Sequence, residues 1–282
     1  QSSFNLRRIP KMADIVIKNK HFTLTIGEDC AAKSLLYTPE SGPTVECLKT
    51  DESIAMFSIT EDRPYNNEIK LAYPNREITM QANRVRQEGD KLIIGFELVG
   101  FEAIVEVKTA DDYITFKFID FIVKPEHFGN LCMTPPPVSK FRMIQLPVKS
   151  RERFGDWLNV MWDDEVAVNV LAACPYPLIS SEKRRDHRIL FGDTLRDVKL
   201  KNAGVALIVS ESSELLDAIE VLEKDYDLPR GVESRRSPLI NRSYYWASNV
   251  NPLTVDEHIE FAKKGGFKWK DSVQKLLPHQ LF

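Results

Sequence analysis

The chain has 282 residues, a net charge of −3 at pH 7 and a hydrophobic share of 43%, which is the composition of a globular protein with a sizeable core. The near-neutral charge argues against a broad surface for nucleic acid or anionic membranes. No uninterrupted apolar run reaches the roughly eighteen residues that a membrane span needs. We therefore expect no nucleic-acid partner and no membrane span.

The cysteines and histidines do not form a metal-binding pattern. The four cysteines, Cys30, Cys47, Cys132 and Cys174, are spread singly, and no two histidines have the H-x-x-x-H or H-E-x-x-H spacing. We expect no metal and no cofactor, and cysteines that lie in or near the core. The chain begins with Gln1 and not with Met, as a mature exported protein does, so the expected location is periplasmic or extracellular with the signal peptide removed.

From residue 14 onward the hydrophobic pattern has the period of two that is typical of β-strands. Short turn signals at 89–90, 99–100 and 111–112 separate successive runs, which forces antiparallel pairing because a parallel crossover takes about a dozen residues. The segments with this pattern are 15–17, 22–26, 54–59, 78–86, 91–98, 101–108, 113–123, 141–148, 157–162, 166–172 and 203–209. The prediction is a mainly β protein in which residues 14–209 form a large antiparallel β-sandwich.

Helical periodicity appears only after the strands. A helix is predicted over 215–226 behind Ser212 and Ser213, and Pro229 ends it. Residues 230–240 are predicted to be a linker. A second helix is predicted over 255–264, where 254–257 has the pattern of a capping box and Gly265 that of a stop. Residues 210–282 are thus predicted to be a helical C-terminal extension.

The hairpin around Asp164 carries the first candidate site. With Asp164 at the centre of the turn, Asn159 faces Asn169 and Trp157 faces Leu171 on one side of the sheet. The other side then carries only apolar residues and must be core, namely Leu158, Val160, Trp162, Val166, Val168 and Val170. An indole beside two amides is a surface that binds sugars, since rings stack on C–H groups and amides bind hydroxyls. The alternative is two asparagines bonded to each other beneath a covering loop, with Trp157 in packing.

The densest basic cluster, over 183–188, carries the second candidate. Arg185 and His187 in this cluster would hold the uronate or sulfate group of an acidic glycan, and the alternative is an exposed charged loop. Adjacent carboxylates elsewhere, such as Asp163 and Asp164, are typical of turns and helix caps. No sequence motif indicates a catalytic residue.

Two stretches resemble a known family. Gly155-Asp156-Trp157-Leu158-Asn159-Val160-Met161-Trp162-Asp163-Asp164, followed by residues 167–172, resembles the last strands of the galactose mutarotase-like supersandwich. That domain precedes the (β/α)8 barrel of many bacterial glycoside hydrolases. Residues 204–208, 219–220, 228–229, 243–246 and 259–267 resemble the junction that leads into such a barrel.

The resemblance implies a carbohydrate-associated module without complete catalytic machinery, because 268–282 stays polar until Leu276 and one βα unit cannot close a barrel. Its expected ligand is an oligosaccharide or polysaccharide. The alternatives are a glycoside hydrolase or an aldose 1-epimerase-like enzyme that uses general acid/base chemistry, and a purely structural module. The last would pack against a barrel, or self-associate, through Tyr244, Tyr245, Trp246 and Phe267.

Overall fold

The computed structural model describes residues 13–62, 77–97, 100–124, 138–238 and 250–265. The chain divides into two compact units, residues 1–232 and 233–282. None of the helices in the described part is long and apolar enough to cross a membrane.

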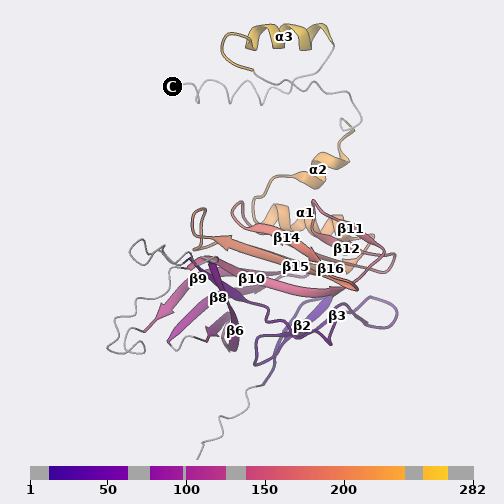
Figure 1. Ribbon diagram of the computed structural model, residues 1–282. Coiled ribbons are helices and arrows are strands. Elements are labelled where there is room, and N and C mark those ends of the chain that lie inside the picture. Colours follow the sequence, from indigo (N-terminus) through magenta and orange to yellow (C-terminus); the bar gives the residue numbers. More distant parts are fainter. Residues whose placement is uncertain (1–12, 63–76, 98–99, 125–137, 239–249, 266–282) are drawn as a thin grey trace, which may run out of the picture. The chain divides into compact units, whose positions relative to one another are not determined.

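The first unit is built from antiparallel strands in two sheets (Figure 1). The small sheet has the spatial order β1 (Ile15–Lys18), β2 (Phe22–Ile26), β3 (Ala32–Tyr37) and β4 (Val45–Glu46). The large sheet has the spatial order β11 (Arg153–Gly155), β12 (Val160–Trp162), β13 (Val166–Ala172), β16 (Gly204–Glu211), β9 (Ile114–Val123), β8 (Phe101–Thr109), β7 (Lys91–Phe96), β6 (Glu77–Glu88), β5 (Ser58–Asp62), β10 (Val138–Lys149), β15 (His187–Leu195) and β14 (Leu178–Lys183). The predicted fold class, mainly β with large antiparallel sheets, is confirmed.

The long strand β6 joins the two layers of the sandwich. Its first half pairs with β5, its second half pairs with β7, and the register with β7 shifts between Ala82 and Arg84. Such a shift bends a strand and increases its twist, so the large sheet folds back on itself. The layer that holds β10, β14 and β15 then contacts the layer that holds β9, β13 and β16.

Phenylalanine side chains fill the space between the layers. The Phe118 ring of β9 lies 5.1 Å from the Phe141 ring of β10 and 4.7 Å from that of Phe121, measured between centroids. Phe141 and Phe118 are almost completely buried. Tilted rings at these distances attract each other beyond their area burial, so this group ties one layer to the other.

Helix α1 (Leu215–Asp225) covers the outer face of β13 and β16. Its residues Ala218, Ile219 and Leu222 form a second apolar cluster with Ala167 and Ile208 of those strands. Two polar contacts fix its C-terminal end: the Tyr113 hydroxyl donates to Asp225 over 2.7 Å, and the Thr115 and Tyr226 hydroxyls lie 2.8 Å apart. The sheet is therefore buried on both sides at this position.

Two further helices follow. Helix α3 (Val255–Lys264) begins and ends as predicted, although the Thr254 side chain does not cap it and Gly265 has an ordinary φ of −74°. Helix α2 (Gly231–Arg236) lies where a linker was predicted. The buried Glu223 carboxylate accepts hydrogen bonds from the backbone N–H groups of Gly231 and Val232. These N–H groups lie in the first turn of α2, where the helix itself offers them no acceptor, so the carboxylate stabilises the start of the helix.

The group of Phe118, Phe121 and Phe141 between the layers leads to a stability prediction. Phe141→Ala should lower the free energy of unfolding by about 3–5 kcal/mol, because it removes a buried ring that bridges both layers. Val16→Ala, at a 58% exposed position, is the control and should change it by less than about 0.5 kcal/mol. Chemical denaturation monitored by circular dichroism measures both, and equal effects of the two variants would contradict the role given to Phe141.

Candidate functional site

The turn between β11 and β12 holds the most exposed large hydrophobic side chain in the described residues. Trp157 has a relative exposure of 100%. The Asn159 N–H donates to the Asp156 carbonyl over 3.1 Å and closes the turn. Asn159 has a φ of +46°, a left-handed conformation that asparagine tolerates better than most residues. An indole is thus presented to solvent by a tight, defined turn.

The two asparagines predicted beside Trp157 are buried. Asn159 is 2% exposed and Asn169 is fully buried. Asn159 Nδ2 donates to the Val170 carbonyl over 3.3 Å, and Asn169 Nδ2 donates to the Leu158 carbonyl. Neither amide bonds to the other, and neither reaches the surface. The Asn169 amide contacts the backbone next to Trp157, and the Asn159 amide contacts the backbone of β13.

The predicted register of this hairpin is wrong by one residue. Val160, not Asn159, lies opposite Asn169, and Met161 lies opposite Val168. Because side chains alternate, a slip of one residue moves every side chain to the other face. Val160 and Ala167 consequently face α1, while Met161 and Val168 face the main core. The single apolar face predicted for 158–170 does not exist, since both faces are buried.

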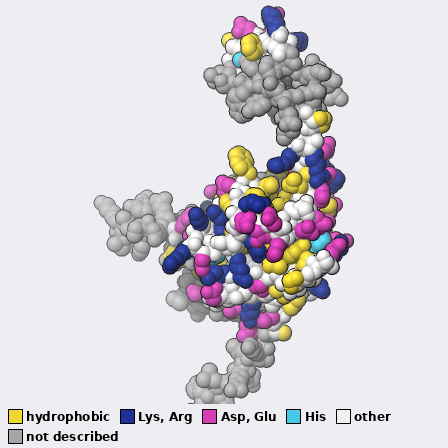
Figure 2. Space-filling model, turned by 90° about the vertical axis from the view of Figure 1, so that its right-hand side faces the viewer, with side chains coloured by type: hydrophobic (Ala, Val, Ile, Leu, Met, Phe, Trp, Pro, Cys, Tyr) yellow, Lys and Arg dark blue, Asp and Glu magenta, His cyan; other side chains and the backbone are white. Residues whose placement is uncertain are grey.

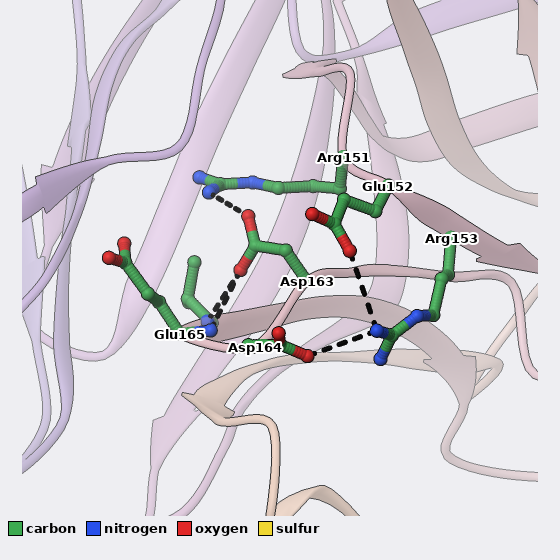
Figure 3. Close-up of polar contacts among 7 residues, drawn as sticks. Arg151, Glu152, Arg153, Asp163, Asp164 and Glu165 are labelled. Atoms are coloured by element: carbon green, nitrogen blue, oxygen red, sulfur yellow. Dashed lines mark hydrogen bonds and ion pairs between the residues drawn. The ribbon is translucent and has the colours of Figure 1, made fainter.

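The Asp163 carboxylate sets this register. Its Oδ1 accepts hydrogen bonds from the backbone N–H groups of Glu165 and Val166, each over 3.0 Å (Figure 3). These bonds make Asp163 the first residue of the turn and place Asp164 and Glu165 together at its centre. A hydrogen bond from Arg151, over 2.7 Å, holds the other oxygen.

The electrostatics of this turn follow from those contacts. Burial acts to raise the pKa of Asp163, but the Val166 N–H, the Arg151 guanidinium and the Glu165 N–H outweigh it and leave the pKa below its ordinary value. Arg153 lies 3.0 Å from Asp164 and 3.4 Å from Glu152 (Figure 3). The two carboxylates at the centre of the predicted hairpin are therefore used in turn formation and ion pairing.

The second predicted group lies on the hairpin of β14 and β15. His187 is 6% exposed, and its two ring nitrogens lie 2.9 Å from Asp186 Oδ1 and 2.6 Å from Glu52 Oε2. The contact of His187 Nε2 with Glu52 is close but lacks hydrogen-bond alignment. Lys49 lies 2.5 Å from Asp186, so loop 49–52 is bound to the hairpin. Arg185 is exposed at the tip.

The two hairpins adjoin through a stacked pair. The Arg188 guanidinium of β15 lies 3.6 Å from the centre of the Phe154 ring of β11. The sequence did not predict this contact, because β11, β14 and β15 were not recognised as strands. The self-association surface predicted at Tyr244, Tyr245, Trp246 and Phe267 lies outside the described residues.

The chemistry available at this edge is stacking and hydrogen bonding. Within the described ranges, no group of three or more His, Cys, Asp or Glu residues is arranged to hold a metal ion. Basic and acidic side chains are interspersed over the face of the first unit seen in Figure 2. The exposed indole of Trp157 is the distinctive feature.

No protein-family model matches the chain, and no curated protein matches it in sequence. Solved structures do match. A GH31 family sulfoquinovosidase from E. rectale, in complex with an aza-sugar inhibitor, is 10% identical with a TM-score of 0.33, and the match covers 75% of this chain and 34% of that one.

A second match is the α-N-acetylgalactosaminidase NagBb from Bifidobacterium bifidum in complex with GalNAc. It is 7% identical with a TM-score of 0.44, and the match covers 89% of this chain and 50% of that one. The chain thus spans between a third and a half of the length of these two glycoside hydrolases.

The His187 group leads to a pH prediction. Lys49, and then His187, lower the pKa of Asp186 from 3.8 to about 2. A lowered pKa contributes stability that is present above the ordinary value and is lost as the pH falls from about 4 to about 2. Carboxyl NMR titration should place the Asp186 midpoint at about 2, and Lys49→Met should raise it.

Lys20→Met is the control. It removes a lysine that is paired with Glu40 over 3.8 Å, and it should leave the midpoint of Asp186 unchanged. A wild-type midpoint at the ordinary value for aspartate would show that the Lys49 contact does not form in solution.

Proposed function

We propose that this β-sandwich is a carbohydrate-associated module that binds an oligosaccharide through Trp157. The observation that supports the proposal is a fully exposed indole on a closed, hydrogen-bonded turn. A tryptophan side chain presents about 150–250 Å² of largely apolar surface, and its hydration is unfavourable. The C–H face of a pyranose ring would cover that surface and leave the sugar hydroxyls in water.

The charges around the turn favour a neutral glycan. Asp156 precedes Trp157 and is exposed, and exposed Glu152 and Asp164 lie on the same group of strands. Arg151 and Arg153 are already paired with carboxylates. A uronate or sulfate group would therefore meet carboxylates in place of unpaired cations.

The alternative acidic-glycan site at Arg185 and His187 is less well supported. Both ring nitrogens of His187 face carboxylates of the protein itself, and the side chain is buried. Lys183, Arg184 and Arg185 are exposed at the tip, where Arg184 is paired with Glu182 and the Asp186 carboxylate follows Arg185. A sulfate or carboxylate would therefore meet carboxylates among these cations.

In the proposed function the module supports glycan handling by a glycoside hydrolase-like protein. The carboxylates of the Trp157 region hold turns and ion pairs, and the proposal assigns none of them to bond cleavage. The affinity of the module for a single glycan chain should be weak, because one exposed aromatic ring without surrounding walls buries little ligand surface.

Affinity electrophoresis against neutral and acidic polysaccharides, followed by calorimetry with the best oligosaccharide, tests the proposal. Trp157→Ala should weaken binding by roughly tenfold or more, because the platform is lost. Trp157→Phe should retain part of the affinity.

Tyr176→Ala provides the control, since Tyr176 is also an exposed aromatic residue, at 38%, but the Lys199 ammonium lies 4.4 Å from the centre of its ring. Undiminished binding by Trp157→Ala, or no retardation of the wild type by any neutral polysaccharide, would refute the proposal.

A further inference from the structure

We infer that Asn159 and Asn169 are positioning residues that hold the Trp157 platform in its binding conformation, an inference that rests on the proposed function. Both side chains are at least nine-tenths buried and cannot themselves touch a glycan on the surface. Their role differs from the direct hydroxyl recognition that the sequence suggested, because it acts through the backbone of the turn.

The two amides tie consecutive residues of the turn to the same neighbouring strand. Asn169 Nδ2 donates to the carbonyl of Leu158, the residue that follows Trp157. Asn159 Nδ2 donates to the Val170 carbonyl, and the Val170 N–H donates back to the Asn159 carbonyl over 3.4 Å. The ladder between β12 and β13 ends at Val160. The amides thus continue the attachment of the turn to β13 beyond the end of the strand, at the two residues that follow Trp157.

This arrangement has a local cost. Asn159 occupies the left-handed region, and among the described residues the Oδ1 atoms of Asn159 and Asn169 are buried without a hydrogen-bond partner. Buried unpaired acceptors and positive φ values are both unfavourable. Asn159, two residues from the exposed Trp157, combines both features, at a place where a rigid turn would serve binding.

Rigidity matters because the platform is so exposed. A large side chain on a mobile turn must be ordered when it binds, and the lost conformational freedom subtracts from the affinity. A turn that is fixed before the ligand arrives avoids that loss. Removing one amide donor should therefore free the indole and weaken glycan binding by about two- to tenfold.

The test uses the full chain labelled with 5-fluorotryptophan, with the Trp157 signal assigned by its absence in Trp157→Phe. Asn159→Gly removes the donor but retains easy access to positive φ, so it separates the hydrogen bond from the backbone conformation. Asn169→Ala removes the second donor. Fluorine NMR relaxation measures the motion of Trp157, and calorimetry measures its glycan affinity.

Gln145→Met is the matched control, because Gln145 is 4% exposed and also donates an amide to a backbone carbonyl, that of Ala55, over 2.6 Å in the other layer. It should lower stability without changing Trp157 motion or affinity. Increased motion with weaker binding in both Asn159→Gly and Asn169→Ala, absent from the control, supports the inference; Asn169→Ala excludes an effect of the glycine itself, because it leaves the residues of the turn unchanged.

Unchanged Trp157 motion in Asn159→Gly overturns the inference, as does increased motion with wild-type affinity. If the wild type binds no neutral oligosaccharide, the proposed function fails together with the positioning role. Wild-type binding with unchanged Trp157 motion in both asparagine variants removes the positioning role alone.

Discussion

The carboxylate of Asp163 determines the arrangement of this edge of the sandwich. By accepting hydrogen bonds from the N–H groups of Glu165 and Val166, it decides where the chain reverses between β12 and β13. Since strand side chains alternate with a period of two, this choice determines which residues face the core and which face α1. Ala167 and Asn169 lie beneath the helix, and Met161 and Val168 enter the main core, because of that turn.

Burial on both faces is the next consequence. Strands β13 and β16 lie between the Phe-rich core on one side and α1 on the other, so small residues such as Ala167 and Ala206 are needed where the helix approaches. A polar residue on such a strand must find a partner within the protein. Asn169 does so through the Leu158 carbonyl, and its position beneath α1 thereby becomes linked to the shape of the Trp157 turn.

The sequence predicted those parts of the fold in which local pattern and tertiary environment agree. The meander from β6 to β9 has short turns and alternating residues, and α3 has clear end signals. Strand β14 was missed because its residues are largely exposed on this edge strand and show no apolar alternation, as in Ser180, Ser181 and Glu182. Helix α2 was missed because its stabilising partner, Glu223, comes from α1 through a tertiary contact that spacing does not reveal.

The candidate site shows the same division. The hairpin that carries Asn159 and Asn169 was evident in the sequence, but its register was predicted wrongly by one residue, because two adjacent turn centres fit the apolar pattern. The side chain of Asp163, rather than the apolar pattern, selects between those centres, and with both faces apolar the pattern carried no information about the choice. One signal did point to the observed backbone conformation: asparagine at the end of a four-residue turn is a residue type that accepts a positive φ.

The strands β11 and β12 are only three residues long, and β11 lies at the end of the large sheet. The backbone hydrogen bonds of so short a hairpin give it only marginal stability, so its order must come from contacts with neighbouring elements. The Arg188 guanidinium stacks on Phe154 at one strand, and the amides of Asn159 and Asn169 hold the turn at its far end. The exposed indole is therefore carried by an element whose conformation depends on side chains from β13 and β15. A ligand surface at the edge of a sheet can be rigid for this reason, although the edge itself has few backbone hydrogen bonds.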